Sequence, residues 1–263
     1  LQGSKYVQSN VREVFDSINE QIKKRVVLFI GTPCQVDAIK RYTGNNENLI
    51  TCDLVCHGVP SPGYFKKYIR YLEKKYNNKI TDFRFRNKCS YDKCGYVENI
   101  IFKSKKRKKI IAEQDPFYYD FIKEKNYRYS CYSCQYKNSN RIGDFTIGDV
   151  NSWESYYDFF PDKATSLVIT NNSKAADILS DLNSYLYIRE IDIEKEEKLN
   201  NALYRQIPMT RERKNIYLYY NNFSEYEKKL LKNISIKEKM KILLKKTIPF
   251  TIRVKIKKIQ RGK

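Results

Sequence analysis

Several features that would classify a chain at once are scarce or absent in this sequence. Its 263 residues include one histidine, one tryptophan and two methionines. No secretory leader, internal repeat or apolar run of membrane-spanning length is visible. These absences argue against a membrane-spanning protein and a repeat array. The length suits one large α/β domain, with or without an appendage.

The cysteine content does not fit a disulfide framework. Seven cysteines is an odd number, and they cluster near the ends of predicted strands. Free thiols persist in a reducing compartment, whereas disulfides mark oxidising ones. We therefore expect a cytoplasmic protein whose cysteines serve chemistry rather than cross-linking.

Aromatic and basic residues are abundant instead. The chain has 23 Tyr and 13 Phe, enough for a sizeable core although only 41% of residues are hydrophobic. The net charge is +21, and residues 221–263 hold fourteen Lys or Arg against three Glu. About half of the excess charge therefore lies in the last sixth of the chain. A basic end of this kind predicts an acidic partner: anionic lipid, nucleic acid or an acidic protein.

The first part of the chain alternates helix and strand patterns. Apolar runs and helical spacing predict strands at 26–30 and 49–56 and helices at 11–22, 36–42 and from 62 onward. Ser9 or Asn10 can cap the first helix, and Ser61 followed by Pro62 is a typical helix start. This alternation predicts an α/β fold with a mostly parallel sheet and flanking helices.

The pattern then becomes antiparallel. Residues 80–86 and 96–103 alternate in polarity around a basic hairpin tip at 105–109, which predicts a small antiparallel β insertion. Further elements are expected as a short aromatic helix at 115–123, strands at 165–170 and 185–191, and a helix at 173–182. After about residue 199 the chain is helical, polar and basic. We expect one main α/β domain at 1–205 and a basic helical tail at 206–263.

Four cysteines stand where a sheet edge would bring thiols together. Cys34 follows the first predicted strand and Cys56 ends the second, so both lie at the carboxyl edge where open α/β sheets bind ligands. Cys131 and Cys134 form a C-x-x-C pair, a spacing that lets two sulfurs face one metal. We interpret the four as one iron–sulfur site. On its own the C-x-x-C pair is ambiguous between zinc, a redox dithiol and iron–sulfur.

The other three cysteines have weaker claims. Cys52 precedes Cys56 by four residues and is most simply a small buried apolar residue. Cys89 and Cys94 could complete a zinc site, but they flank a predicted hairpin loop far from the strand ends. We interpret all three as thiols without a role.

Five motifs occur in a fixed order along the chain. They are Gly3-Ser4-Lys5-Tyr6-Val7-Gln8-Ser9, Gly31-Thr32-Pro33-Cys34-Gln35, Asp53-Leu54-Val55-Cys56-His57-Gly58-Val59-Pro60-Ser61, Ser130-Cys131-Tyr132-Ser133-Cys134 and Gly143-Asp144-Phe145-Thr146-Ile147-Gly148-Asp149. Together they resemble the coenzyme F420 hydrogenase/dehydrogenase beta-subunit family, most closely the bacterial members found near polysaccharide biosynthesis genes. The resemblance covers about residues 1–205 and leaves the basic tail outside.

The resemblance implies a flavin and iron–sulfur oxidoreductase. Family members hold a 4Fe-4S cluster at positions that match Cys34, Cys56, Cys131 and Cys134. They bind FAD or FMN near stretches that match residues 3–10 and 147–151. The flavin exchanges hydride with a substrate, which in archaeal members is the deazaflavin coenzyme F420. For this chain the substrate is expected to be that coenzyme or an unknown glycan-pathway compound.

Individual residues acquire candidate roles from this resemblance and from their chemistry. The candidate flavin-binding residues are Gly3, Ser4, Lys5, Tyr6, Ser9, Asn10, Thr32, Gln35, Gly148 and Asp149. Lys5 suits a flavin or phosphate charge, or is simply a solvated lysine, and Asp149 suits a flavin contact or a turn cap. His57 is a candidate proton donor, although a hydrogen bond beside the cluster is the commoner role for such a residue.

The start of the chain departs from the family pattern. Members usually carry a further N-terminal segment that completes the flavin site, often after a dicluster ferredoxin domain. Neither is present, and the chain begins at Leu1 rather than Met. We expect an N-terminally truncated member whose electron partner is a ferredoxin-like domain or an electron-donor protein encoded upstream.

The basic tail allows two interpretations of similar weight. Apolar residues at 234, 236, 240, 243 and 244 interleave with lysines. This pattern is typical of a helix that lies on the anionic inner face of a membrane. The same pattern fits a solvated helix that closes the domain. Nucleic-acid binding is the weaker prediction because no recognition motif accompanies the charge.

Two alternatives to an oxidoreductase stay open. One is a zinc-stabilised binding module without redox chemistry. The other is a catalytically degenerate interaction module of a polysaccharide-biosynthesis complex, which would keep the fold and show no flavin turnover.

Overall fold

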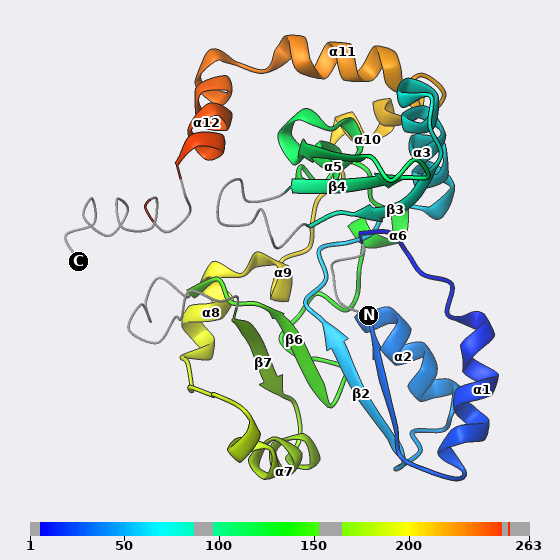
Figure 1. Ribbon diagram of the computed structural model, residues 1–263. Helices are drawn as coiled ribbons and strands as arrows, with labels where there is room; N and C mark the ends of the chain where they lie inside the picture. Colours follow the sequence, from blue (N-terminus) through cyan, green and yellow to red (C-terminus); the bar gives the residue numbers. More distant parts are fainter. Residues whose placement is uncertain (1–5, 87–96, 153–164, 249–251, 253–263) are drawn as a thin grey trace. The chain divides into compact units, whose positions relative to one another are not determined.

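The chain folds into two compact units that alternate along the sequence (Figure 1). The computed structural model describes residues 6–86, 97–152, 165–248 and 252. One unit, called the sheet unit below, comprises Asn10–His57 and Ser133–Ile207. The other, called the aromatic unit, comprises Leu1–Ser9, Gly58–Tyr132 and Pro208–Lys263. The expected division near residue 205 stays a prediction.

A four-stranded sheet forms the centre of the sheet unit. Its strands are β1 (Val27–Gly31), β2 (Leu49–Leu54), β6 (Phe145–Asp149) and β7 (Ser166–Thr170), in the order β1-β2-β6-β7. β1 and β6 both run parallel to β2, whereas β7 runs antiparallel to β6. The expected α/β fold with a mostly parallel sheet is confirmed.

The remaining elements of the sheet unit are helical. They are α1 (Arg12–Ile22), α2 (Pro33–Tyr42), α7 (Ser173–Asp181), the 3-10 turn η4 (Asn183–Tyr185), α8 (Ile193–Leu199) and α9 (Asn201–Tyr204). Ile22, Phe29, Val36, Ile39 and Leu49 form one buried cluster that joins α1 and α2 to the first two strands. Both helices therefore pack on β1 and on the start of β2.

Two details of the sheet unit differ from expectation. The N-cap of α1 is Val11 rather than Ser9 or Asn10, and the Asn10 side chain instead accepts a hydrogen bond from the Arg12 amide at 3.2 Å. Residues 186–191 form no strand. The side chains from 182 to 190 are all exposed, with Tyr185 at 82% and Tyr187 at 81%. An apolar strand without a face to bury has little to hold it in a sheet.

The aromatic unit contains the antiparallel insertion. Its sheet has the order β3-β4-β5, with β3 (Ile80–Arg84), β4 (Val97–Phe102) and β5 (Arg107–Ile111), all antiparallel. This confirms the expected insertion. The basic hairpin turn lies at residues 103–106, and Arg107 already belongs to β5. The predicted loop at 89–94 lies outside the described residues.

The helices of the aromatic unit precede and follow this small sheet along the sequence. They are α3 (Pro62–Tyr76), the 3-10 turn η2 (Ala112–Gln114), α5 (Pro116–Ile122), α6 (Tyr129–Tyr132), α10 (Arg211–Ile216), the 3-10 turn η5 (Tyr217–Tyr219), α11 (Phe223–Asn233) and α12 (Ile236–Thr247). The Ser61 side chain caps α3 as its sequence predicts, accepting from the Tyr64 amide at 3.2 Å. In the part of the chain that is described, no helix combines the length and apolar content needed to cross a bilayer.

Stacked rings form the core of the aromatic unit. The Phe117 ring lies 5.1 Å from Tyr68 and 5.5 Å from Tyr64, centroid to centroid. Phe223 of α11 joins the cluster, 5.3 Å from Tyr64. Glu227, one turn further along α11, accepts a hydrogen bond from the Tyr71 hydroxyl at 2.7 Å. Helix α11 therefore packs on α3 and adds a ring to the aromatic core.

Candidate functional site

The first candidate ligand lies in the opening turn of α2. Thr32 is the N-cap, Pro33 occupies the first helical position, and Cys34 follows. Gln35 completes a capping box, with its side-chain oxygen 3.0 Å from both the Thr32 amide and the Thr32 hydroxyl. Cys34 is exposed, and its sulfur lies 3.2 Å from the Thr32 hydroxyl. The helix thus begins three residues earlier than expected, and the thiol sits on its first turn, where amides point outward.

Thr32 and Gln35 were both candidates for binding a cofactor. Their capping hydrogen bonds give each side chain a structural role. Gln35 is also buried, at 7% exposure. A contact of either residue with flavin or cluster sulfur stays a prediction.

The second candidate ligand follows β2. The strand ends at Leu54, so Cys56 lies two residues beyond it in an irregular segment and is partly buried. Cys52 lies inside the strand at 5% exposure, as expected for a small buried residue. Burial, with a smaller contribution from the Asp53 charge, raises the pKa of the Cys52 thiol to about 11. Because metal ligands are thiolates, Cys52 is a poor ligand and Cys56 is the better candidate.

The C-x-x-C pair spans a change of unit. Cys131 lies in the short helix α6 of the aromatic unit, with its sulfur 4.0 Å from the Val59 carbonyl oxygen. Cys134 begins the return of the chain into the sheet unit, and both thiols are partly buried. The Cys89 and Cys94 pair lies outside the described residues.

The loop after Cys134 is fastened beside the other two thiols of the sheet unit. The Tyr136 hydroxyl donates to Asp37 of α2 at 2.7 Å, three residues after Cys34. Lys137 donates from its ammonium group to the His57 carbonyl oxygen at 3.1 Å, one residue after Cys56. Cys134 is thus held near the segments that carry both Cys34 and Cys56. Tyr136 and Lys137 were not singled out from the sequence, where only their nearness to the C-x-x-C pair marks them.

His57 lies in a site that disfavours its charged form. Burial lowers the pKa of the imidazole, repulsion from Lys137 lowers it further, and attraction to Asp149 acts in the opposite direction. The side chain is nevertheless exposed to solvent. A neutral imidazole has one N–H donor and one acceptor nitrogen, so His57 can hold or accept a proton at this sheet edge.

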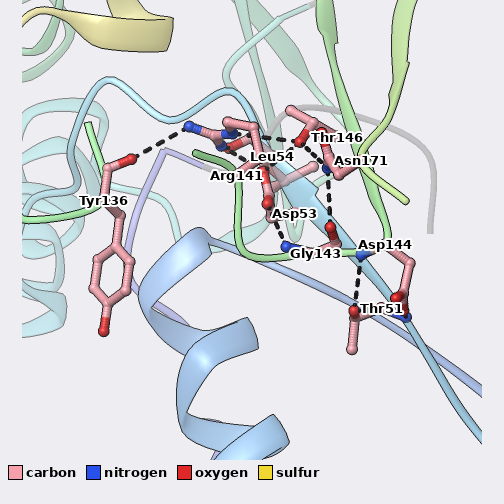
Figure 2. A network of polar contacts seen from close by, with 9 residues as sticks. All are labelled: Thr51, Asp53, Leu54, Tyr136, Arg141, Gly143, Asp144, Thr146 and Asn171. Carbon is pink, nitrogen blue, oxygen red and sulfur yellow. Dashed lines mark hydrogen bonds and ion pairs between the residues drawn. The ribbon is translucent and has the colours of Figure 1, made fainter. Parts of the chain in front are cut away.

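A buried polar network supports this edge from within the sheet (Figure 2). Arg141 forms an ion pair with Asp53, and the two side chains are only 4% and 0% exposed. The guanidinium also donates to the Leu54 carbonyl at 3.2 Å and to the Tyr136 carbonyl at 3.3 Å. Arg141 therefore ties the end of β2 to the loop that follows Cys134.

Two carboxylates, those of Asp53 and Asp144, accept further hydrogen bonds in this network. Asp53 accepts from the Gly143 amide at 2.8 Å and from the Thr146 hydroxyl at 3.0 Å. Asp144 accepts from the amide and the hydroxyl of Thr51, each at 2.7 Å. Burial acts to raise the pKa of Asp144, but the hydrogen bonds from Thr51 outweigh it and hold that pKa below its ordinary value. Both carboxylates are therefore buried and stabilise the sheet through their hydrogen bonds.

The end of β6 supplies the last pair of candidates. A Cβ on Gly148 would lie 2.6 Å from a methyl carbon of Val55, so the close approach of the chain after β2 requires glycine here. Asp149 ends the strand with an exposed side chain. The segment beyond is fixed by buried Glu196, whose carboxylate accepts from the amides of Asn151 and Ser152, each at 2.8 Å. Flavin contacts of Gly148 and Asp149 stay predictions.

The N-terminal candidates are described only in part. Gly3, Ser4 and Lys5 lie outside the described residues. The Tyr6 ring stacks on Phe121 of α5, with ring centroids 4.4 Å apart. This packing gives Tyr6 a place in the aromatic core, and a flavin role for it and for Ser9 and Asn10 stays untested.

The four proposed ligands fit an iron–sulfur cluster in chemistry. None of the four is in a disulfide, cysteine sulfurs are the soft donors that such clusters use, and none is fully buried. Across the described ranges, no three or more His, Cys, Asp or Glu side chains form a group arranged to hold a single metal ion. The donor types therefore support the ligand set, whereas its assembled geometry stays a proposal.

The comparisons with known proteins agree with the motifs. The family model that describes the C terminus of the coenzyme F420 hydrogenase/dehydrogenase beta subunit matches residues 24–196. This match confirms the resemblance and does not extend to the basic C-terminal segment. Among solved structures, one similar chain comes from the F420-reducing NiFe hydrogenase complex of Methanosarcina barkeri. It is 14% identical with a TM-score of 0.44, over 89% of this chain and 68% of that chain. Among curated proteins, no relative matches the sequence.

Proposed function

The chain belongs to the coenzyme F420 hydrogenase/dehydrogenase beta-subunit family, and from this membership we propose that it is an iron–sulfur and flavin-dependent oxidoreductase. When bound, a 4Fe-4S cluster supplies one-electron transfer, and FAD or FMN supplies hydride exchange with coenzyme F420 or a glycan-pathway compound. The proposal includes an electron-donor partner, either a ferredoxin-like domain or a separate protein. It also requires a reducing compartment, because cysteines that ligate a cluster must not be oxidised to disulfides.

The fastening of the loop after Cys134 is the observation that carries this proposal. Tyr136 binds Asp37 beside Cys34, and Lys137 binds the His57 carbonyl beside Cys56. Side chains from one loop thus hold two thiol-bearing segments at the carboxyl edge of the sheet. A structural role alone would not require a cysteine on each of these three segments.

Each thiol has a distinct setting in this proposal. Cys34, Cys56, Cys131 and Cys134 would hold the cluster through their sulfur atoms. The outward-pointing amides at the start of α2 favour negative charge near Cys34. The ammonium group of Lys137 donates to the His57 carbonyl oxygen, one residue after Cys56, and would offset the negative charge of a Cys56 thiolate.

His57 would act on protons beside the thiols. Desolvation lowers its pKa and so favours the neutral imidazole, which can donate through one ring nitrogen or accept through the other. Lys137 favours this neutral form by repulsion. His57 is therefore our candidate for proton exchange during hydride transfer, and its position after Cys56 is what supports it.

Metal and flavin analysis of the full chain tests the proposal. We expect an anaerobically purified and reconstituted protein to contain roughly four iron and four sulfide per chain and to absorb broadly near about 400 nm. Cys34→Ser and Cys134→Ser should each lose most of that iron and absorbance. Cys52→Ala is the matched control, because Cys52 is buried and its raised thiol pKa makes it a poor ligand.

The outcomes separate the competing functions. Full iron and sulfide in the Cys34 and Cys134 variants would overturn the ligand set. A colourless protein with one zinc after reconstitution would support the zinc-stabilised module instead. A cluster without flavin reduction by any donor would point to a degenerate interaction module.

A further inference from the structure

Among the described side chains of helix α12, Ile242 is the one that is buried in the aromatic unit. The Ser235 cap and Glu238 form a capping box, which fixes the start of the helix. Ile242 is buried at 6% exposure and packs in a small cluster with Ile111 of β5 and Ile234. This contact holds the helix against the unit and determines which side faces outward.

The outward side of α12 carries an apolar stripe. Ile236, Met240, Leu243 and Leu244 are 78%, 60%, 61% and 49% exposed. Their spacing of four, three and one residues places them on a single face, since about 3.6 residues make one turn. Ile242 falls on a different face. The exposed stripe is therefore distinct from the side of the helix that packs in the core.

Positive charge lies next to this stripe. Lys237 and Lys239 are exposed and flank it on opposite sides, and Lys241, Lys245 and Lys246 belong to the same helix. Glu238 is the single acidic residue of the helix, and it accepts hydrogen bonds from the Ser235 amide and hydroxyl at 3.2 and 3.1 Å. The helix therefore presents apolar side chains between basic ones, with little negative charge.

We propose that α12 is a peripheral membrane anchor that binds the surface of an anionic phospholipid bilayer. The apolar stripe would enter the boundary between headgroups and acyl chains, and the flanking lysines would meet the phosphate groups. A nucleic acid would use the lysines but leave the stripe in water. A second copy of this basic chain would bury the stripe but bring like charges together.

Vesicle co-sedimentation with the full chain tests this inference. We expect binding to vesicles of phosphatidylglycerol and phosphatidylcholine, little binding to phosphatidylcholine alone, and weakening as NaCl rises from about 0.1 to 0.5 M. Leu243→Glu should lower the partition coefficient at least about tenfold. Lys237→Glu with Lys239→Glu should lower it about thirtyfold.

A matched pair of lysines controls for net charge. Lys103→Glu with Lys106→Glu changes the net charge equally on an exposed hairpin of the same unit. This variant should weaken binding by less than about threefold, because the hairpin lies outside the proposed surface. Circular dichroism should show unchanged folding in all variants, since every substituted side chain is exposed.

Three results would overturn the inference. They are no binding of the unaltered chain to anionic vesicles, equal losses in the helix and hairpin variants, or unchanged binding of Leu243→Glu. Light scattering that shows a dimer dissociated by Leu243→Glu without lipid would assign the stripe to self-association. Iron and flavin contents are measured separately, so failure here leaves the redox proposal standing.

Discussion

The two units bury acidic side chains in opposite ways. In the sheet unit, Asp53 is paired with Arg141 and accepts further hydrogen bonds, so a charged carboxylate is stabilised (Figure 2). In the aromatic unit, Glu98, Asp115 and Asp120 are at most 1% exposed, and none forms an ion pair with a described residue. Burial is the main cause that raises the pKa of all three: that of Glu98 far above its ordinary value, that of Asp115 to about 6 and that of Asp120 to about 7.

This difference shows two ways of meeting the cost of desolvation. A buried charge must be paired or neutralised. The sheet unit pairs it, and the same arginine holds the loop after Cys134. The aromatic unit instead raises the pKa of its buried carboxyls, so that they keep their protons to higher pH, and tyrosine hydroxyls donate to two of them, Tyr68 to Asp115 and Tyr226 to Asp120. The pH response of stability should therefore have opposite signs in the two units.

The largest effect is expected from breaking the buried ion pair of Asp53 and Arg141. Arg141→Met leaves Asp53 buried without its cation, so we expect the free energy of unfolding to fall by about 3–5 kcal/mol. The substitution also removes the donor to the Tyr136 carbonyl, so iron content should fall with stability. Urea unfolding followed by circular dichroism, together with iron analysis, measures both.

An exposed pair provides the control for Arg141. Lys23 binds Glu20 at 2.6 Å on the surface of α1, with both side chains 59% exposed. Lys23→Met should leave stability unchanged within error. Equal effects of the two substitutions would contradict the claim that burial makes the Arg141 pair important.

The second expected effect concerns Asp120, a buried carboxyl whose pKa is raised. The unfolded Asp120 carboxyl titrates near 3.8, whereas the folded one keeps its proton until about pH 7. The unfolded state therefore loses its proton first, and stability should fall as pH rises between these values, by about 2–4 kcal/mol. Asp120→Asn mimics the protonated form and should remove much of this loss. Unfolding measured at pH 5 to 8 compares the two proteins.

Asp144 supplies the opposite sign for comparison. Its folded pKa lies below the ordinary value, so its stabilisation is complete above that value and is lost as pH falls through the folded pKa. Asp144→Asn should leave the slope between pH 5 and 8 unchanged. If Asp120→Asn also leaves this slope unchanged, the Asp120 carboxyl is ionised in the folded protein and the comparison fails.

The smallest expected effect tests backbone packing. Gly148→Ala would place a Cβ against Val55 of the sheet unit and should destabilise by about 1–3 kcal/mol. Val55→Ala should restore only part of the loss, since it removes the nearest methyl carbon but leaves the Val55 Cβ 2.8 Å from the new Cβ. Gly63 of α3 is the counterpart in the aromatic unit, where a Cβ meets nothing nearer than 3.5 Å. Gly63→Ala should stabilise by about 0.5–1 kcal/mol, and a loss there would contradict this difference.

The fold was predictable where the pattern is local. Apolar runs located β1 and β2 within two residues, and Ser61 with Pro62 located the start of α3. The strand expected at 185–191 was wrong because β propensity does not reveal whether a face is buried. The antiparallel direction of β7 was likewise not foreseen, since strand direction depends on long-range pairing.

The site was predictable in its residue types and less so in its surroundings. The position of Cys34 beside a helix start and the burial of Cys52 were foreseen. The links from Tyr136 and Lys137 were not, because they join residues 80 or more positions apart. Buried Glu98 was also missed. Alternation in β4 suggested one solvated face, but residues 97–100 are all buried.

The order of segments along the chain has a consequence for biosynthesis. The sheet unit ends at Ile207, whereas the aromatic unit still lacks Phe223 of α11, which packs between Tyr64 and Tyr71 of α3. During synthesis the ribosome therefore releases every part of the sheet unit first. Residues 58–132 have by then also emerged, but their ring cluster still lacks Phe223. During that interval the emerging aromatic surface is a natural substrate for chaperones. A stop codon just after residue 207 would make this transient state permanent.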